Sequence, residues 1–501
     1  MNSKNNNMQN IITRYCINPE ILFPEYDTDT GELVKTHDYN DFCHLINRWK
    51  IILVKKYNVQ PGQTIFLSAG PNLYYYSLFF AAAELGLVFI VDWPHVFLER
   101  DLEDPKVVAH GQIDYIFIHS DFHKIDSLHA TPYWEIQRNL KFGKNLLYQD
   151  EFYNYTITKS EGITDIVNAI WASPESDLIY STSSGTTGPP KKFTDSHKKV
   201  YLTAKRLANL YFTKNESVLH YKTIQHGASM AIHFLPGFMT GGKQFTAEGT
   251  NGDHNSMDPV IQFVMDNKIN QLFLYNVAQI TYFLKNMPRA DHCVNIVTLY
   301  QITPEIVALI KEKNINWVKT VFGDTTIGIG FFIKTVNQTT DILNYEITNL
   351  GKPLDDFFQF ELRNGNLYIS CPALNEDYRT SNDIFEIING DYYFKGRANQ
   401  YRINGEWIKL NEIEQKVQQL FGIHGANIVV DAEHQKIYLA IWEENLQAET
   451  ELITFFTKNY ESVNISYVLR NEDYNQFFNS RKIDNSKIRM VCRQQILTNQ
   501  G

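Results

Sequence analysis

Residues 181–192 read STSSGTTGPPKK and follow the short apolar run 177–180, which is typical of a buried strand. Hydroxyl side chains crowd this stretch, together with Gly185 and Gly188. Glycine lets a backbone turn sharply and approach a ligand closely, and consecutive N–H groups in such a turn form a concave anion site. Lys191 adds a point charge that suits phosphate. The stretch therefore predicts a loop that binds a polyphosphate.

The loop differs from the common phosphate-binding loop, in which four residues separate the first glycine from a Gly-Lys-Ser/Thr ending. Two prolines precede Lys191, and Gly185 and Gly188 lie close together. Clusters of Ser, Thr and Gly also mark ordinary flexible linkers. From this stretch alone, both a phosphate-binding loop and a flexible linker are possible. Motifs elsewhere in the chain are needed to distinguish them.

Composition limits the possible functions. The chain has 501 residues, enough for more than one domain, with the hydrophobic (44%) and charged (20%) contents of an ordinary globular protein. Its 46 basic and 56 acidic side chains give a net charge of −10. That sign is wrong for neutralising nucleic-acid phosphates, so we expect no nucleic-acid partner.

The sequence also indicates a compartment. Residues 1–10 are polar and lack the apolar segment of a secretory signal. The most hydrophobic stretch, 74–91, contains Glu84 and Gly86, which favours a core helix followed by a strand over a membrane span. The five cysteines show no metal-ligand or disulfide spacing. We therefore expect a cytoplasmic protein without a membrane partner.

Hydrophobic periodicity predicts an α/β fold with parallel sheets, because helix and strand patterns alternate. Thr303 and Pro304 form the start of one helix, as cap and first residue. Strands are expected at 64–68, 87–91, 115–118, 269–276 and 317–322, and helices at 38–57, 72–85, 200–211 and 277–286. Only the strand at 115–118 is clear within 104–161. A smaller C-terminal α/β part is expected from helices 411–421 and 449–460 and strands 426–430 and 437–442.

Residues 184–191 resemble the Ser-Gly-Thr-Thr-Gly-x-Pro-Lys signature of the adenylate-forming superfamily, which includes acyl- and aryl-CoA ligases, adenylation domains of nonribosomal peptide synthetases and firefly luciferase. The resemblance implies an acyl-CoA synthetase-like fold, with a large N-terminal domain of mixed α/β subdomains (1–397) and a small mobile α/β lid (398–501). It also implies that the loop binds the β- and γ-phosphates of ATP. The loop residues concerned are Ser184, Gly185, Thr186, Thr187, Gly188 and Lys191.

Residues 322–326 resemble the superfamily's Tyr-Gly-x-Thr-Glu motif. The resemblance implies that Phe322 stacks on adenine, a role that needs only the ring face. It also implies that Thr325 donates to the α-phosphate, with Gly323 and Asp324 completing this part of the nucleotide site.

Two departures from the superfamily pattern bear on catalysis. Thr326 stands where the motif has a Glu that partners Mg²⁺, a hard cation that prefers carboxylate, water and phosphate oxygens. The metal would then be bound by ATP, waters and Thr187, or by Asp324. Residues 299–302 read LYQI where relatives carry a glycine turn beside adenine.

His226 and Gly227 lie in a segment that is apolar on its C-terminal side. A lone histidine in such a stretch is more often structural. The resemblance instead implies that His226 lines the acid pocket as a catalytic residue and that Gly227 lines the substrate channel. Amino-acid-activating domains usually offer an Asp in this region, and 221–242 contains none. This favours a small carboxylic acid without a free α-amine.

Three C-terminal motifs complete the resemblance. Residues 378–383 resemble Tyr-x-Thr-Gly-Asp, so Asp383, otherwise an ordinary turn residue, would accept from the ribose hydroxyls. Residues 396–414 resemble the hinge and the loop after it: Arg397 would reach the ribose or phosphate, Asn399 sits near the hinge, and Gly405 would line the tunnel of a pantetheine thiol. Residues 483–489 resemble the terminal lysine motif rather than a solvated basic tail, so Lys487 would bridge the acid's carboxylate and the α-phosphate.

Three functions remain open. The first is an AMP-forming ligase that uses ATP and Mg²⁺ to join a carboxylic acid to CoA or a phosphopantetheine thiol. The second is a stand-alone adenylation enzyme that loads an acyl carrier protein or another acceptor. The third is a degenerate nucleotide-binding module, which Thr326 and the altered 299–302 segment motivate.

Overall fold

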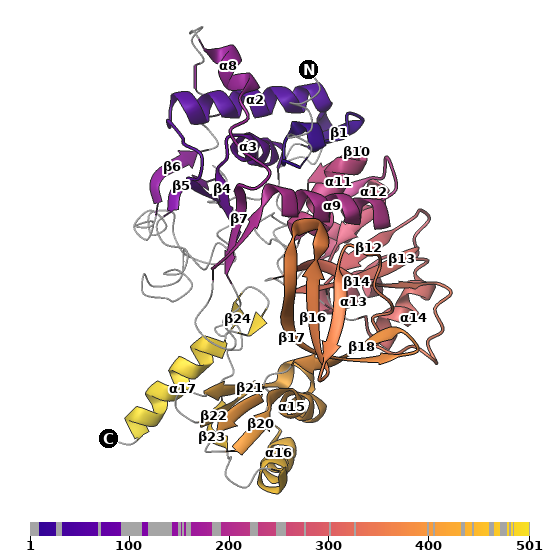
Figure 1. The fold of residues 1–501 in the computed structure, drawn as a ribbon. Coiled ribbons are helices and arrows are strands. Elements are labelled where there is room, and N and C mark those ends of the chain that lie inside the picture. The colour runs from indigo at the N-terminus through magenta and orange to yellow at the C-terminus, as the bar shows by residue number, and fades with distance from the viewer. Residues whose placement is uncertain are drawn as a thin grey trace. The chain divides into compact units, whose positions relative to one another are not determined.

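The computed structural model describes residues 10–26, 33–68, 72–91, 113–118, 143–148, 152, 155–156, 162–182, 192–220, 229–246, 257–274, 277–299, 302–324, 327–397, 400–403, 406–431, 436–442, 445–459, 465–470, 478–479, 482–483 and 485–499 (Figure 1). Described residues up to 358, with 372–375, form one compact unit, and 359–371 with those from 376 onward form a second. The compact units thus divide before the predicted lid boundary at 397/398, which stays a prediction about where the chain swivels.

The first sheet of the first unit is mostly parallel, as predicted. Its described strands follow the order β6-β5-β3-β4-β7-β8, and only β8 is antiparallel to its neighbour. The expected strand 64–68 is confirmed, but sequence reasoning missed the strand after 115–118. The strands are β3 (Thr64–Ser68), β4 (Val88–Ile90), β5 (Ile113–Ile118), β6 (Gly143–Tyr148), β7 (Asp177–Thr182) and β8 (Lys192–Ser196).

The helices predicted at 38–57 and 72–85 are confirmed, and the first residue of each predicted stretch is the N-cap. Asp38 accepts a hydrogen bond from the Asp41 backbone at the start of α2 (Tyr39–Lys55), and Asn72 does the same for Tyr75 at the start of α3 (Leu73–Glu84). The two helices lie side by side (Figure 1). Short helices η1 (Arg14–Cys16) and α8 (Ile163–Asn168) also belong to this unit.

The second sheet follows the order β14-β13-β12-β11-β9-β10-β1-β2, and β9 to β13 and β1 all run parallel. The predicted strand 269–276 is too long, because β11 covers only three residues and residues 269, 270 and 274 lie outside it. The strands are β1 (Ile21–Tyr26), β2 (Leu33–His37), β9 (Val218–His220), β10 (Gly242–Thr246), β11 (Gln271–Phe273), β12 (Asn295–Thr298), β13 (Trp317–Asp324) and β14 (Gly328–Asn337).

Helices pack on both faces of the second sheet: residues of α12, α13 and α14 on one face, and residues of α9 and η4 on the other. Thr303 caps α14 by accepting from the Ile306 backbone, and Pro304 is its first residue. The helix predicted at 277–286 has those bounds. The helices are α9 (His197–Tyr211), the π-helix η4 (Met230–Phe234), α11 (Leu235–Thr240), α12 (Asp258–Asp266), α13 (Val277–Asn286) and α14 (Pro304–Glu312).

An aromatic core joins α2, α3 and α11. The rings of Phe42, Phe80 and Phe238 pack together, with centroids 5.6 to 5.9 Å apart. Trp49 is fully buried in the same core and donates its indole N–H to the Tyr74 carbonyl at 3.1 Å. Truncating any of these rings to alanine costs about 3–5 kcal/mol in a typical core.

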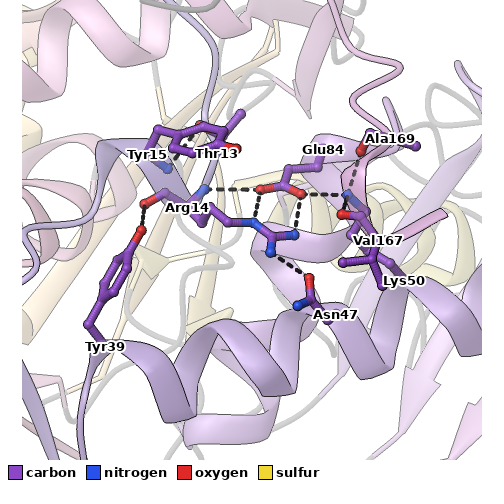
Figure 2. Close-up of polar contacts among 9 residues, drawn as sticks. All are labelled: Thr13, Arg14, Tyr15, Tyr39, Asn47, Lys50, Glu84, Val167 and Ala169. Carbon is purple, nitrogen blue, oxygen red and sulfur yellow. Dashed lines mark hydrogen bonds and ion pairs between the residues drawn. The ribbon is translucent and has the colours of Figure 1, made fainter. Parts of the chain in front are cut away.

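One buried cluster of charges ties four chain segments together (Figure 2). The Glu84 carboxylate accepts from the Arg14 guanidinium at 2.9 and 2.7 Å and from the Lys50 ammonium at 2.8 Å. Lys50 also donates to the carbonyls of Val167 and Ala169. Burial alone would raise the pKa of Glu84, but Arg14 and Lys50 lower it below its usual value, so the carboxylate stays charged.

The second unit contains an antiparallel sheet followed by smaller α/β elements. Its four-stranded sheet of described strands is β15 (Gln359–Arg363), β16 (Asn366–Cys371), β17 (Glu376–Ile388) and β18 (Asp391–Arg397). The predicted C-terminal helices and strands are confirmed with small shifts of their ends. The later elements are β19 (Gln400–Ile403), β20 (Glu406–Lys409), α15 (Leu410–Gly425), β21 (Ala426–Asp431), β22 (Lys436–Ile441), α16 (Leu446–Asn459), β23 (Ile465–Arg470), β24 (Phe478–Asn479), β25 (Lys482–Ile483) and α17 (Asn485–Asn499).

In neither unit do the described residues include a helix with the length and apolar character needed to cross a bilayer.

Candidate functional site

The predicted phosphate loop connects two paired strands at the end of the first sheet. β7 runs parallel to β4 and β8 returns antiparallel, with Thr182 opposite Lys192 where the described strands stop. Ligands of α/β proteins bind at the carboxyl ends of parallel strands, and the loop follows β7 at that edge. Residues 183–191, and with them Ser184, Gly185, Thr186, Thr187, Gly188 and Lys191, lie outside the described residues.

Lys192 is a second cation beside this loop that sequence reasoning did not select. Its ammonium lies 3.6 Å from the centroid of the Tyr180 ring, a cation–π distance. The Lys192 side chain is exposed; loss of some hydration beside neighbouring atoms lowers its pKa, and the charge of Asp177 opposes that shift. Its place directly after Lys191 in the sequence could have indicated a second cation at this loop.

The predicted adenine motif lies at the end of β13, where β9, β11 and β12 also end. The β13–β14 pairing shifts register between Phe322 and Gly323. A Cβ atom on Gly323 would lie 2.6 Å from the Ile329 Cα atom, so only glycine fits this shift. Phe322 is half-buried, with its ring centroid 6.2 Å from that of Phe332.

Asp324 ends β13, and its carbonyl accepts from the Ile327 backbone at 3.2 Å. Thr325 and Thr326 lie outside the described residues. The structure therefore places Phe322, Gly323 and Asp324 at the carboxyl edge of the parallel strands of the second sheet.

The segment expected to bind the acid joins β9 to η4 at the same edge. His226 and Gly227 lie outside the described residues, between His220 at the end of β9 and Met230 at the start of η4. π-Helical segments are rare and often occur at functional sites. The chain thus has an unusual helix directly after the predicted acid-binding residues.

Two buried histidines on either side of this segment in the sequence were not selected as site residues. The His220 and His233 rings have centroids 5.2 Å apart. His220 Nε2 donates to the Gln244 side-chain oxygen at 2.7 Å, whereas His233 Nε2 has no hydrogen-bond partner among the described residues. Burial lowers the pKa of His220 to about 4 and that of His233 well below its usual value. Both imidazoles are therefore neutral at pH 7.

Asp383 and Arg397, which the sequence assigned separately to the nucleotide, lie directly opposite each other on β17 and β18. Asp383 is buried, with 3% of its surface exposed, so it is not a solvated turn residue. Asn399 and Gly405 lie outside the described residues; Gly405 falls between the paired strands β19 and β20.

Lys487 is exposed in the first turn of α17, a helix that sequence reasoning did not predict. The residue after it, Ile488, is fully buried. Lys487 therefore stands on a packed helix and not on a solvated tail.

The donor set fits a metal that is bound mainly by nucleotide. The described residues contain no cluster of three or more His, Cys, Asp or Glu side chains that would form a metal cage. Mg²⁺ commonly binds to one or two carboxylates and to substrate phosphates. Asp324, at the end of β13, would supply one such carboxylate.

No protein-family model matches the chain, and no curated protein matches it. Solved structures do match, and they define the class by fold: the chain has the fold of adenylate-forming enzymes. The predicted fold is thereby confirmed.

Three of the similar structures show how far the likeness extends. A fatty acyl-adenylate ligase of E. coli or L. pneumophila is 14% identical with a TM-score of 0.70, and 98% of each chain is covered. The amide bond synthetase McbA of Marinactinospora thermotolerans is 13% identical with a TM-score of 0.67, covering 97% of this chain and 99% of that one. The O-succinylbenzoate-CoA synthetase of Bacillus subtilis, solved with ATP and a magnesium ion, is 14% identical with a TM-score of 0.66, covering 95% and 98%.

Proposed function

We propose that the protein activates a carboxylic acid with ATP as an acyl-adenylate and then transfers the acyl group to a thiol. The single observation that carries this proposal is the pairing of Asp383 with Arg397. Two residues assigned to the nucleotide from separate motifs occupy opposite positions in one antiparallel ladder, and Asp383 is buried. A buried carboxylate and a basic residue at paired positions of two strands suit the ribose and phosphate of a nucleotide.

In the proposed first step the acid's carboxylate oxygen attacks the α-phosphorus of ATP, an oxygen–phosphorus bond forms, and pyrophosphate leaves. The protein contributes positioning and charge stabilisation, which suffice for phosphoryl chemistry of this kind. Phe322 would stack on adenine and Asp383 would bind the ribose. Lys487 would offset the repulsion between the acid's carboxylate and the α-phosphate, which lie about 3 Å apart and repel by several kcal/mol in a partly dry site. Asp324 would hold Mg²⁺, which supplies charge neutralisation to the phosphates when bound.

The proposed second step forms a thioester and releases AMP. A thiolate attacks the carbonyl carbon of the adenylate, and the bond between that carbon and the phosphate oxygen breaks. The lid would rotate near Asn399 between the two steps, and Gly405 would line the thiol's path. The similar structures include CoA ligases, a fatty acyl-adenylate ligase and an amide synthetase, so the fold is compatible with several acceptors.

Pyrophosphate release with a panel of carboxylic acids tests the first step. We expect release that depends on both acid and ATP, and better turnover with acids that lack an α-amine. ATP or AMP binding without turnover by any acid would refute the proposal in favour of a nucleotide-binding module. Adding CoA, or a carrier protein bearing phosphopantetheine, and measuring the thioester then identifies the acceptor.

A further inference from the structure

Helix α17 is anchored to the three-stranded sheet of the second unit. Ile488 and Cys492 lie one helical turn apart on its inner face, and both are fully buried. A buried cysteine of this kind packs as a small apolar side chain. The two side chains belong to a cluster with Val429, Tyr438, Ala440 and Leu469 of β21, β22 and β23.

A second, polar contact fixes the same helix. The Arg493 guanidinium donates from Nε to Oδ2 of Asp431 at 2.7 Å and from a terminal nitrogen to Oδ1 at 2.8 Å. Only 1% of the Asp431 side chain is exposed, and the Tyr438 hydroxyl donates to it at 3.2 Å. Paired bonds between two planar groups set orientation as well as distance.

These contacts determine where Lys487 stands. Lys487 directly precedes Ile488 and lies about 9 Å along the helix axis from Arg493. Because a helix moves as a rigid element, any rotation or slide at Arg493 carries Lys487 with it. The apolar contacts set how deep α17 lies on the sheet, and a bidentate pair on its flank resists rotation about its axis.

We propose that Asp431 and Arg493 are positioning residues that hold Lys487 in register for adenylate formation. The inference rests on the proposed function, because it takes Lys487 as the lysine that bridges the acid and the α-phosphate. It adds that the position of the Lys487 side chain depends on an ion pair almost two turns further along α17, and not only on the residues in its own turn of helix.

The test measures initial rates of acid-dependent pyrophosphate release by the full-length protein and its variants, at a temperature where each variant is folded. Arg493→Gln should lower kcat between about 10- and 100-fold, since displacement of a catalytic group by about 1 Å costs on that order, while KM for ATP changes less than about twofold. Arg493→Lys keeps the charge but loses the paired bonds, so its rate should be intermediate. The control is Arg363→Gln, which breaks an exposed pair with Glu361 in the same unit (2.7 Å, with 48% and 46% of the side chains exposed) and should leave the rate unchanged.

A double variant separates positioning from a general loss of structure. If Arg493 acts through Lys487, adding Arg493→Gln to Lys487→Ala should slow the reaction by less than about twofold further. An additive loss in that background, or a normal kcat for Arg493→Gln in an active wild type, would overturn the inference while leaving the proposed function intact. A wild type that releases no pyrophosphate with any acid would instead refute the proposed function, and the inference would fall with it.

Discussion

Replacing Glu84 by Gln should strongly destabilise the first unit. The side chain keeps its shape, but the guanidinium of Arg14 and the ammonium of Lys50 lose the carboxylate that both contact within 3 Å. The Lys50 side chain is fully buried, and burial already lowers its pKa against the opposing charge of Glu84.

The size of this loss in stability follows from the charged groups that Glu84→Gln leaves without a carboxylate. Breaking a buried ion pair by removing one partner costs about 3–5 kcal/mol, and here two cations lose one partner, so the upper half of that range is expected. Lys50→Met should cost less, because Glu84 keeps Arg14 and no buried cation is left unpaired. Its main penalty is the lost donor to the carbonyls of Val167 and Ala169, two half-buried residues, at about 1 kcal/mol each, the low end for an unsatisfied group. The double variant should cost clearly less than the sum, because the glutamine then has no buried ammonium beside it.

Hydrogen exchange of the α3 amides measures this free energy without assuming that the whole chain unfolds in one step. The expected loss of about 4–5 kcal/mol corresponds to exchange faster by roughly 10³ to 10⁴. Glu305→Gln is the matched control, because it breaks a pair with Lys285 at 2.6 Å in which both side chains are more than half exposed, and it should cost no more than about 1 kcal/mol. Equal effects of the two substitutions would show that the buried cluster contributes no special stability.

Three further expectations concern acid stability and the nucleotide site. Burial lowers the pKa of His197 and of His220 to about 4, so between pH 6.5 and 4 the unfolded chain binds protons that the folded chain excludes. Each histidine should therefore reduce the free energy of unfolding by up to about 3 kcal/mol as the pH falls through that window. His220→Gln should flatten this part of a curve of stability against pH. Gly323→Ala forces a Cβ atom against the β14 backbone, so it should raise KM for ATP at least about tenfold and lower stability by about 1–3 kcal/mol. An unchanged KM would show that the end of β13 does not bind the nucleotide. Lys487→Ala should reduce adenylate formation by orders of magnitude while calorimetry shows nearly unchanged ATP binding, whereas Asp383→Ala should weaken ATP binding itself. A normal pyrophosphate-release rate for Lys487→Ala would remove Lys487 from its proposed role. An unchanged ATP affinity for Asp383→Ala would do the same for Asp383.

Local signals predicted the parts of the fold that depend on local physics. The cap Thr303 marked the start of α14, helical spacing of apolar residues gave α2 and α3 to within one or two residues, and the short buried-type run 64–68 gave β3 with its bounds. The strand at 269–276 was drawn too long because apolar residues continue past both ends of the three residues that pair.

Pairing across long distances left little trace in the sequence. Glu84 was noted only as a charge that argues against a membrane span, and nothing near Lys50 or Glu84 in the sequence indicates that they share a site with Arg14. Helix α17 was missed because its polar residues hide the short apolar spacing of Ile488 and Cys492, and its partners on β21 and β22 come from a different stretch of chain. Asp383 was selected by its motif, but its place opposite Arg397 follows only from the β17–β18 register.

The N-terminal segment has a practical consequence for anyone preparing this protein. Arg14 contacts the buried carboxylate of Glu84, and the Ile12 backbone N–H donates to Nδ1 of His197, at 3.2 Å, where α9 begins. Residues 11–16 therefore fasten two helices that are remote in sequence. A shortened version of the protein should keep Ile11 and everything after it. An N-terminal purification tag should be separated from residues 11–16 by a spacer, so that it does not disturb these contacts.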